Sequence, residues 1–297
     1  MKFVYQVLIN KIYRKALKPF SAILPNKYKI AVNGTFTVKS KSGIQFKMVT
    51  NPTNAVTKFL FWGGVEGFEY NSSRVFCEVI NHASVFFDIG ANIGYYSLLA
   101  SSIRQKNIQV FAFEPMPSIY DFLIKNCEVN GFDNIRCFQL ALSDAAGEAT
   151  FYGVVNPKFE HLPQLTGDGG LSKDHSGKIS KIQFQVNTMG LDAFVTANLP
   201  DKKIDFIKLD TEANEHRVLS AAHKVLSEHR PIIQCEILKN QIESEMQHIL
   251  DRYGYLYYRA IDKGLMLVDS FSNNNSDFVD YYLVPKEKQN LVSKFVI

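Results

Sequence analysis

The sequence predicts an α/β protein built on a mostly parallel sheet with helices on both faces. From residue 85 onward, short apolar runs alternate with longer segments of helical pattern, as in a chain that winds strand, helix, strand. Several of these runs end in an acidic residue, and the first is followed by two glycines four positions apart. The first 80 residues lack this alternation. We therefore divide the chain into an N-terminal extension, residues 1–80, and a main domain, residues 81–297.

The N-terminal extension begins with a basic amphipathic segment. Residues 3–24 mix apolar side chains with four Lys and Arg residues. A helix of this kind can pack on the following domain or lie on an anionic membrane surface, and the sequence leaves both open. The runs 36–38 and 44–46, separated by a turn at 41–43, predict a hairpin. Farther on, Glu66 and Glu69 lie beside the single tryptophan and a glycine pair, in a segment that contacts a ligand or caps the sheet.

Composition places the protein in the cytoplasm, peripheral to the membrane if the basic helix lies there. No apolar stretch reaches the roughly 18–20 residues that cross a bilayer. The four cysteines form no C-x-x-C pair, and we interpret them as small apolar side chains in a reducing compartment. The net charge of +4 is mild for 297 residues, so we expect no nucleic-acid partner. The oligomeric state stays open.

The first predicted strand, residues 85–89, leads into a glycine turn. Asp88 lies in the strand, Gly90 and Gly94 follow, and residues 92–103 can form a helix. Glycines let the backbone turn sharply and approach a ligand. The helix would then direct its N-terminal amides and its positive dipole toward that ligand.

A second acid points to a nucleoside. The run 108–114 predicts the next strand and ends in Glu114, which can accept hydrogen bonds from two vicinal ribose hydroxyls. A dinucleotide fingerprint needs a third glycine in the first turn, but Asn92 stands there. The pattern therefore disfavours an NAD-dependent dehydrogenase, and no tyrosine–lysine pair at dehydrogenase spacing is present.

The remaining elements follow the same alternation. A helix starts after Pro115 and Pro117 and ends at Asn130-Gly131, a C-cap signal. The next strands are expected at 134–142, 204–210 and 231–238, with helices to about 228 and 253 and two last strands at 255–261 and 278–284. Residues 153–180 form a glycine-rich insertion with little periodicity. This insertion is either a lid over the substrate or a mobile surface loop.

Five blocks of sequence together resemble one known family. They are DIGANIGYYS, FAFEP, an NG followed by an apolar strand and ALSD, DFIKLDTEANE, and PIIQCEI, in order across roughly residues 60–240. The set is similar to the FkbM family of class I S-adenosylmethionine-dependent methyltransferases. One position departs from it, because the family usually has D-x-E-G-x-E after the fourth strand and this chain has Ala213 in place of the glycine.

The resemblance implies the class I methyltransferase fold, a Rossmann-like, seven-stranded, mostly parallel sheet whose last strands form its antiparallel end. It also implies S-adenosylmethionine as the cofactor. The residues we expect around that cofactor lie in the glycine turn and after the next two strands: Asp88, Gly90, Asn92, Gly94, Tyr95, Glu114, Ser143 and Asp144. Ser143 and Asp144 match the place where this fold contacts adenine.

The turn after the fourth strand is the candidate catalytic segment. Asp210, Glu212 and His216 follow that strand, and Glu212 and His216 are four apart, so on a helix they would share a face and form an oriented base. Asp210 with Glu236 could instead hold a divalent cation that lowers the pKa of a substrate hydroxyl. We do not predict a metal.

The expected function is O-methylation of a hydroxyl on a sugar, glycan or related secondary metabolite. The acceptor class rests on the resemblance alone. A nucleic-acid amine acceptor is disfavoured, because the residues Asp210-Thr211-Glu212-Ala213 are not the Asp/Asn-Pro-Pro-aromatic turn of such enzymes. A lipid acceptor and a non-catalytic, cofactor-binding homologue disabled at Ala213 stay open.

Overall fold

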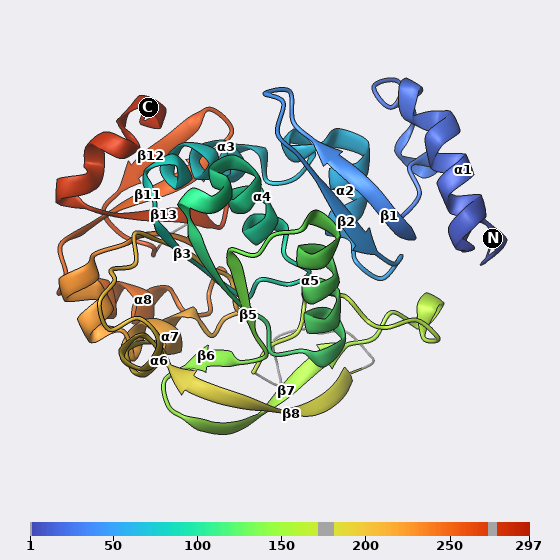
Figure 1. Ribbon diagram of the computed structural model, residues 1–297. Coiled ribbons are helices and arrows are strands. Elements are labelled where there is room, and N and C mark those ends of the chain that lie inside the picture. Colours follow the sequence, from blue (N-terminus) through green and yellow to red (C-terminus); the bar gives the residue numbers. More distant parts are fainter. Residues whose placement is uncertain (1, 172–180, 273–277) are drawn as a thin grey trace.

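A central eight-stranded sheet organises the molecule. The computed structural model describes residues 2–171, 181–272 and 278–297 (Figure 1). The strand order is β12-β11-β13-β10-β9-β3-β4-β5. The bounds are β3 (Val85–Ile89), β4 (Gln109–Phe113), β5 (Ile135–Phe138), β9 (Phe206–Leu209), β10 (Ile232–Glu236), β11 (Tyr255–Ile261), β12 (Gly264–Val268) and β13 (Asp280–Pro285).

Five neighbouring strands of this sheet are parallel, and the mostly parallel α/β fold is confirmed. β5, β4, β3, β9 and β10 run in one direction, while β13 pairs antiparallel with both β10 and β11. The expected count of seven strands is one too low. The extra strand, β12, turns back directly from β11 at residues 262–263 and pairs with it along the edge of the sheet.

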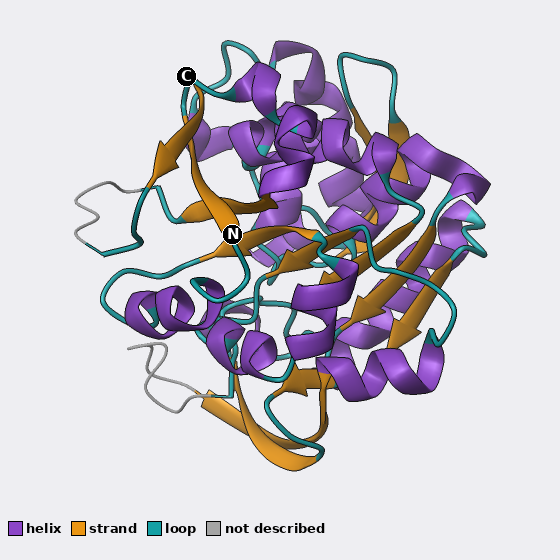
Figure 2. Cartoon of the chain, turned by 90° about the vertical axis from the view of Figure 1, so that its left-hand side faces the viewer, coloured by secondary structure: helices purple, strands orange, loops and turns teal. Residues whose placement is uncertain are grey.

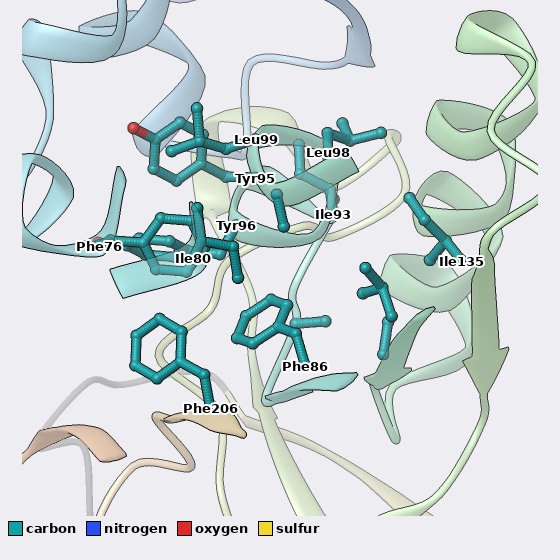
Figure 3. Close-up of a cluster of buried hydrophobic side chains, with 14 of the residues drawn as sticks. Phe76, Ile80, Phe86, Ile93, Tyr95, Tyr96, Leu98, Leu99, Ile135 and Phe206 are labelled. Carbon is teal, nitrogen blue, oxygen red and sulfur yellow. The ribbon is translucent and has the colours of Figure 1, made fainter. Parts of the chain in front are cut away.

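Helices cover both faces of the sheet (Figure 2). α3 (Tyr70–Val79), α4 (Tyr95–Arg104) and α5 (Pro117–Asn130) bury apolar side chains on one face. α6 (Leu191–Asn198), α7 (Glu215–Ser220) and α8 (Glu243–Leu250) do so on the other. Alternation along β3 feeds both cores, since Phe86 belongs to the first and Phe87 to the second. In Figure 3 the rings of Phe76, Phe86 and Phe206 meet in the first core, with centroids 5.3–5.5 Å apart.

The N-terminal extension contains α1 (Val7–Leu17), the hairpin β1 (Gly34–Lys39) and β2 (Gln45–Thr50), and α2 (Val56–Gly63), and it ends with α3. The expected hairpin is confirmed, with Phe36 paired to Met48. Phe36, Val38, Phe46 and Met48 are buried in the same core as α3, α4 and α5. The extension therefore shares its apolar core with the main domain.

A second, three-stranded sheet lies between β5 and β9 along the chain. It has the order β6-β8-β7, formed by β6 (Ala141–Ser143), β7 (Gly147–Val154) and β8 (Lys181–Gly190). The single strand expected at 134–142 is therefore two strands in different sheets. The helix expected to about residue 228 ends at Ser220, and a separate five-residue π-helical turn spans Val225–His229. The sequence pattern missed both breaks because apolar residues recur on either side of each, with Phe138 and Leu140 around the first and Ala222 and Val225 around the second.

Candidate active site at the carboxyl ends of the strands

A cavity of about 290 Å³ opens where the parallel strands end. This is the edge at which open α/β sheets bind ligands. Six of the residues expected to bind the cofactor, act in catalysis or hold a metal line it: Gly90, Asn92, Glu114, Asp210, Glu212 and Glu236. They come from the ends of four strands, β3, β4, β9 and β10, so the parallel sheet brings them together. The other expected site residues lie elsewhere.

The glycine turn is fixed by its contact with the turn after β9. Gly90 has φ +80°, and a Cβ at this position would lie 1.8 Å from the carbonyl oxygen of Asp210. Gly94 has φ +95°, and a Cβ there would lie 2.7 Å from Cδ1 of Leu123. Both positions favour glycine for conformation, and Gly90 demands it for space as well, because its neighbour is backbone. Gly90 lines the cavity, whereas Gly94 is the N-cap of α4 and lies against α5.

Glu114 faces the cavity with both carboxylate oxygens already held by the backbone. Oε2 accepts the amide hydrogen of Asn92 at 3.0 Å, and Oε1 accepts that of Met116 at 2.9 Å. A carboxylate has about four acceptor positions, so two remain for further donors. Burial raises the pKa of Glu114 to about 7, although the two amide hydrogen bonds oppose that rise. The carboxyl is thus oriented and able to accept two hydroxyl hydrogen bonds.

Asn92 connects the glycine turn with two other parts of the chain. Its φ is +51°, and its Oδ1 accepts hydrogen bonds from its neighbour Ile93 N at 2.7 Å and from Asn54 Nδ2 at 3.1 Å. Asn54 Nδ2 also donates to Leu165 O at 2.9 Å. Asn54 therefore joins the N-terminal extension, the glycine turn and the insertion at one wall of the cavity.

Asp88 and Tyr95 lie beneath the glycine turn and do not line the main cavity. Asp88 is buried and accepts a hydrogen bond from Ser97 Oγ at 2.6 Å, and burial raises its pKa to about 6. The Tyr95 hydroxyl lies 3.2 Å from that of Ser73. Both side chains border a small neighbouring cavity of about 70 Å³ under the turn.

Lys208 is a buried cation at the centre of several carboxylates. It forms an ion pair with Asp210 at 2.5 Å, and its ammonium lies 5.3 Å from the ring centre of Tyr96. Burial lowers the pKa of Lys208, but the carboxylates of Asp210 and Glu69 outweigh it and raise that pKa overall. Glu69 accepts a hydrogen bond from Tyr96 Oη at 2.5 Å, and burial raises the pKa of Glu69. The ion pair with Lys208 therefore fixes the carboxylate of Asp210 at the end of β9.

The turn after β9 has an unusual backbone conformation. Glu212 and Ala213 have φ of +58° and +65°, in the left-handed region. Glu215 closes the turn, because its Oε1 accepts hydrogen bonds from Thr211 N at 2.6 Å and Thr211 Oγ1 at 2.9 Å. Left-handed geometry explains why the family usually has glycine at position 213. In this chain Ala213 adopts the left-handed conformation, which costs an alanine roughly 1–2 kcal/mol in strain.

The expectation that Glu212 and His216 share a helix face is wrong. α7 begins only at Glu215, so Glu212 lies in the turn and not on the helix. Glu212 lines the cavity, and burial raises its pKa to about 8, with the charge of Asp210 adding to the rise. His216 does not line the cavity, and burial lowers its pKa. The structure therefore brings Asp210 and Glu212 together and leaves His216 apart.

Ser143 and Asp144 border a different cavity, of about 330 Å³, together with Arg217. Ser143 Oγ lies 3.1 Å from Asp144 Oδ1 and 3.3 Å from Asn214 Oδ1. The main cavity is lined at this position by the residues just before them, Leu140, Ala141 and Leu142. The break between β5 and β6, which the sequence did not reveal, produces this offset.

The described part of the insertion forms a wall of the cavity. Thr166, Gly167, Asp168, Gly169 and Leu171 line it. Before them, Leu165 N donates to Thr53 Oγ1 at 2.8 Å and Asn51 Nδ2 donates to Pro163 O at 2.8 Å. The insertion also contributes to β7 and to a bridge between Tyr152 and Gly170. Residues 172–180 of the expected lid lie outside the described residues.

Sequence reasoning missed several cavity residues from the N-terminal extension. Thr53, Asn54, Ala55, Val56 and Phe68 line the cavity together with Glu69. The sequence left Glu66 and Glu69 either in contact with a ligand or capping the sheet; Glu69 lines the cavity, whereas Glu66 accepts a hydrogen bond from Lys41 N at 2.8 Å. Asn54 gives no motif signal, because its role depends on hydrogen bonds to residues 38 and 111 positions away.

The metal site that the sequence leaves possible would consist of Asp210 and Glu236. Across residues 2–171, 181–272 and 278–297, no group of three or more His, Cys, Asp or Glu side chains is arranged to hold a metal ion. Asp210 and Glu236 both line the cavity, and burial raises the pKa of Glu236, with Asp210 adding to the rise.

Among the residues that the structure describes, no helix is long and apolar enough to cross a membrane.

The strand order, the glycine turn and the acids around one cavity define a class I methyltransferase domain. The family model described as "Methyltransferase FkbM domain" matches residues 88–257, more than half of the chain. The chain therefore belongs to the FkbM methyltransferase family.

Individual relatives are distant. The chain is 24% identical over 215 residues to methyltransferase sdnD of Sordaria araneosa, covering 62% of this chain and 78% of that protein. It is 26% identical over 159 residues to the human tRNA (guanine(37)-N(1))-methyltransferase, covering 53% of this chain and 25% of that protein. A crystal structure of a methyltransferase FkbM from Methylobacillus flagellatus KT is 14% identical, with a TM-score of 0.43, covering 68% of this chain and 43% of that one.

Proposed function

We propose that this methyltransferase uses S-adenosylmethionine to methylate a hydroxyl group of a small-molecule or glycan acceptor. One observation supports this most strongly. The cavity at the ends of β3, β4, β9 and β10 combines one oriented carboxylate, Glu114, with a second group of acids, Asp210, Glu212 and Glu236. S-adenosylmethionine carries a ribose with two hydroxyls and a cationic sulfonium, and these acids suit both.

The cofactor fits the residues that are present. Glu114 has acceptor capacity for the two ribose hydroxyls after its two amide bonds. Leu140, Ala141, Leu142 and Ile119 supply an apolar wall for the adenine. Asp210 supplies negative charge for the sulfonium and the amino group, and a cationic cofactor favours ionisation of Glu212 and Glu236, whose pKa values burial raises. When bound, the cofactor supplies a methyl group that its positive sulfur has already activated.

The chain's own residues position the acceptor and take its proton. Methyl transfer forms an oxygen–carbon bond, breaks the sulfur–carbon bond and releases S-adenosylhomocysteine, so the hydroxyl proton must go to a base. Glu212 suits this role, since it borders the cavity and its pKa of about 8 is close to neutral pH. Asp210, held by Lys208, can orient the hydroxyl for in-line attack.

Calorimetric titration tests the cofactor assignment. We expect the protein to bind S-adenosylmethionine and S-adenosylhomocysteine and to give no response to NAD. Incubation with labelled S-adenosylmethionine and a panel of glycans, read by mass spectrometry, tests the acceptor. NAD binding without any response to S-adenosylhomocysteine would overturn the cofactor assignment. Label found only on nucleic acid or protein would overturn the acceptor class.

A further inference from the structure

Helix α1 buries two polar side chains against the protein and leaves apolar side chains exposed on its outer side. Asn10 and Arg14 are 0% and 2% exposed, whereas Leu8 and Ile12 on the opposite side are 69% and 60% exposed. Soluble helices normally bury the apolar side, because burying a leucine or isoleucine side chain is favourable by roughly 1.5–3 kcal/mol. The exposed apolar side chains on the outer side of α1 therefore indicate that something else covers them.

Hydrogen bonds fix this orientation. Arg14 Nε donates to Asn10 Oδ1 at 2.7 Å, and Asn10 Nδ2 donates to Ala31 O at 3.0 Å. The guanidinium of Arg14 also lies 4.6 Å from the ring centre of Phe61. Burial lowers the pKa of Arg14 to about 10, so the group stays charged at neutral pH. Rotating α1 to bury Leu8 and Ile12 would break these bonds, and the apolar side stays outward.

The exposed apolar residues continue beyond the helix at both ends. We define the apolar face as Phe3, Val7, Leu8, Ile12, Phe20 and Ile23, whose exposed fractions range from 54% to 82%. Figure 1 shows α1 at the edge of the molecule, beyond the hairpin β1–β2. The exposed lysines Lys11 and Lys15 lie on the same helix as Leu8 and Ile12.

Charge is divided unevenly along the chain. The first 65 residues contain eleven Lys and Arg and no Asp or Glu, whereas residues 66–297 contain 22 Lys and Arg and 29 Asp and Glu. The segment that carries the apolar face is therefore the strongly basic part of a protein whose remainder is net acidic. Apolar side chains beside basic ones are the combination that binds an anionic bilayer surface.

We propose that the apolar face of α1 docks this protein on an anionic lipid bilayer. Phe3, Leu8 and Ile12 enter the boundary between headgroups and acyl chains, while Lys11 and Lys15 contact anionic headgroups. A two-fold pairing of α1 with a second copy fits less well, because it would bring Lys11 and Lys15 close to their own equivalents. Tyr5 packs edge-on against Phe159 with ring centres 5.0 Å apart, so the docked segment adjoins the insertion that walls the active-site cavity.

Vesicle co-flotation of the full chain tests the proposal without requiring methyl transfer. Vesicles of pure phosphatidylcholine are compared with vesicles containing 30% phosphatidylserine or phosphatidylglycerol. We expect at least tenfold stronger binding to either anionic vesicle, and a marked decrease when salt rises from 0.1 to 0.5 M, because screening weakens the lysine contacts. Equal binding to neutral and anionic vesicles, or no binding above background, would overturn the proposal.

Two variants separate the apolar and basic contributions. L8S/I12S and K11E/K15E should each lower binding to anionic vesicles at least tenfold, while the matched controls L267S and K263E/K286E, which change exposed residues far along the chain, should stay within twofold of wild type. Circular dichroism and thermal melting confirm folding, and if L8S/I12S unfolds, K11E/K15E decides. Unchanged binding in a folded helix variant would overturn the proposal. A different result would also overturn it: the wild-type protein binds no vesicles but self-associates without lipid, and L8S/I12S abolishes that self-association. The apolar face would then pack against a second copy of the chain.

Discussion

Glu114 illustrates how one residue combines two constraints at the residue scale. Its carboxylate is fixed by the amides of Asn92 and Met116, so it is oriented before any ligand arrives. A preoriented acceptor loses little conformational entropy on binding, which favours affinity. The same two hydrogen bonds also tie Glu114 to the glycine turn. A substitution of Glu114 can therefore disturb the turn as well as the ligand site, so the folding of each variant has to be checked.

Glu114→Ala should weaken the binding of S-adenosylmethionine by about 1.5–3 kcal/mol, the range for hydrogen bonds to a charged group. The reason is the loss of the ribose acceptor. Calorimetric titration measures the change, and thermal melting shows whether the glycine turn survives. Glu114→Gln is the matched control, since its amide oxygen still accepts one hydrogen bond and the loss should be smaller. Unchanged affinity in a folded Glu114→Ala variant would remove this residue from the cofactor site.

Asp210 and Glu212 should govern turnover more than cofactor affinity. Asp210→Asn and Glu212→Gln keep side-chain shape and remove charge, so turnover should fall at least tenfold in each if they orient and deprotonate the acceptor. Steady-state kinetics with titrated cofactor affinity separates the two effects. His216→Gln is the comparison variant, because His216 lies outside the cavity and turnover should stay within twofold. Full activity in both acid variants would contradict the assignment of this turn to catalysis.

At the scale of elements, the turn between β9 and α7 determines where the side chains of Asp210 and Glu212 lie. Two consecutive residues, Glu212 and Ala213, hold left-handed backbone conformations, and Glu215 ties the turn together through Thr211. Such strain persists only where the surrounding structure imposes it. Here the carbonyl oxygen of Asp210 occupies the position that a Cβ on Gly90 would need. The two turns therefore depend on each other.

Ala213→Gly should leave the free energy of unfolding unchanged or raise it by up to about 1.6 kcal/mol. Glycine relieves roughly 1–2 kcal/mol of left-handed strain and gives back roughly 0.4–1 kcal/mol through the greater entropy of the unfolded chain. Ala193→Gly, at an exposed position inside α6, is the matched control and should cost about 0.5–1 kcal/mol. Chemical denaturation measures both. A destabilisation at position 213 as large as that at position 193 would show that the turn is unstrained.

At the scale of the whole molecule, buried acids accumulate around one cavity. Burial raises the pKa of Glu114 and Glu215 to about 7 and that of Glu212 to about 8. A carboxyl whose folded pKa exceeds the unfolded value, roughly 4.3 for glutamate, binds its proton more tightly when folded. Its stabilising contribution is complete below that unfolded pKa and is lost as pH rises through the folded one.

The free protein should therefore lose stability between about pH 5 and pH 8, while its affinity for S-adenosylmethionine rises over the same interval. A cationic cofactor favours the ionised carboxylates, so binding should release protons. Denaturation at several pH values measures the first effect, and calorimetry in two buffers of different ionisation enthalpy measures the second. Glu212→Gln, which removes one titrating group, should release fewer protons. An affinity that stays constant from pH 6 to 8.5 would contradict this coupling.

Removal of residues 1–20 should leave cofactor affinity within twofold of the full chain. The cavity lining starts at Thr53, and the contacts of α1 are to residues 28–33 and to α2. Calorimetric titration of the truncated protein, after circular dichroism confirms its fold, gives the result. Lost cofactor binding in a folded truncation would show that the N-terminal helix supports the site through Tyr5 and Phe159.

The sequence by itself determined the parallel α/β fold, the glycine turn and the acids at the strand ends. These features are local, because strand periodicity, turn residues and an acid at the end of a strand can each be recognised within a few consecutive residues. Tertiary structure alone decided that Asn54, Phe68 and Glu69 complete the cavity, and that Lys208 holds Asp210. It also placed His216 and Ser143 outside the main cavity, because α7 starts late and β6 leaves the central sheet. Such outcomes depend on contacts between distant segments, which no local pattern encodes.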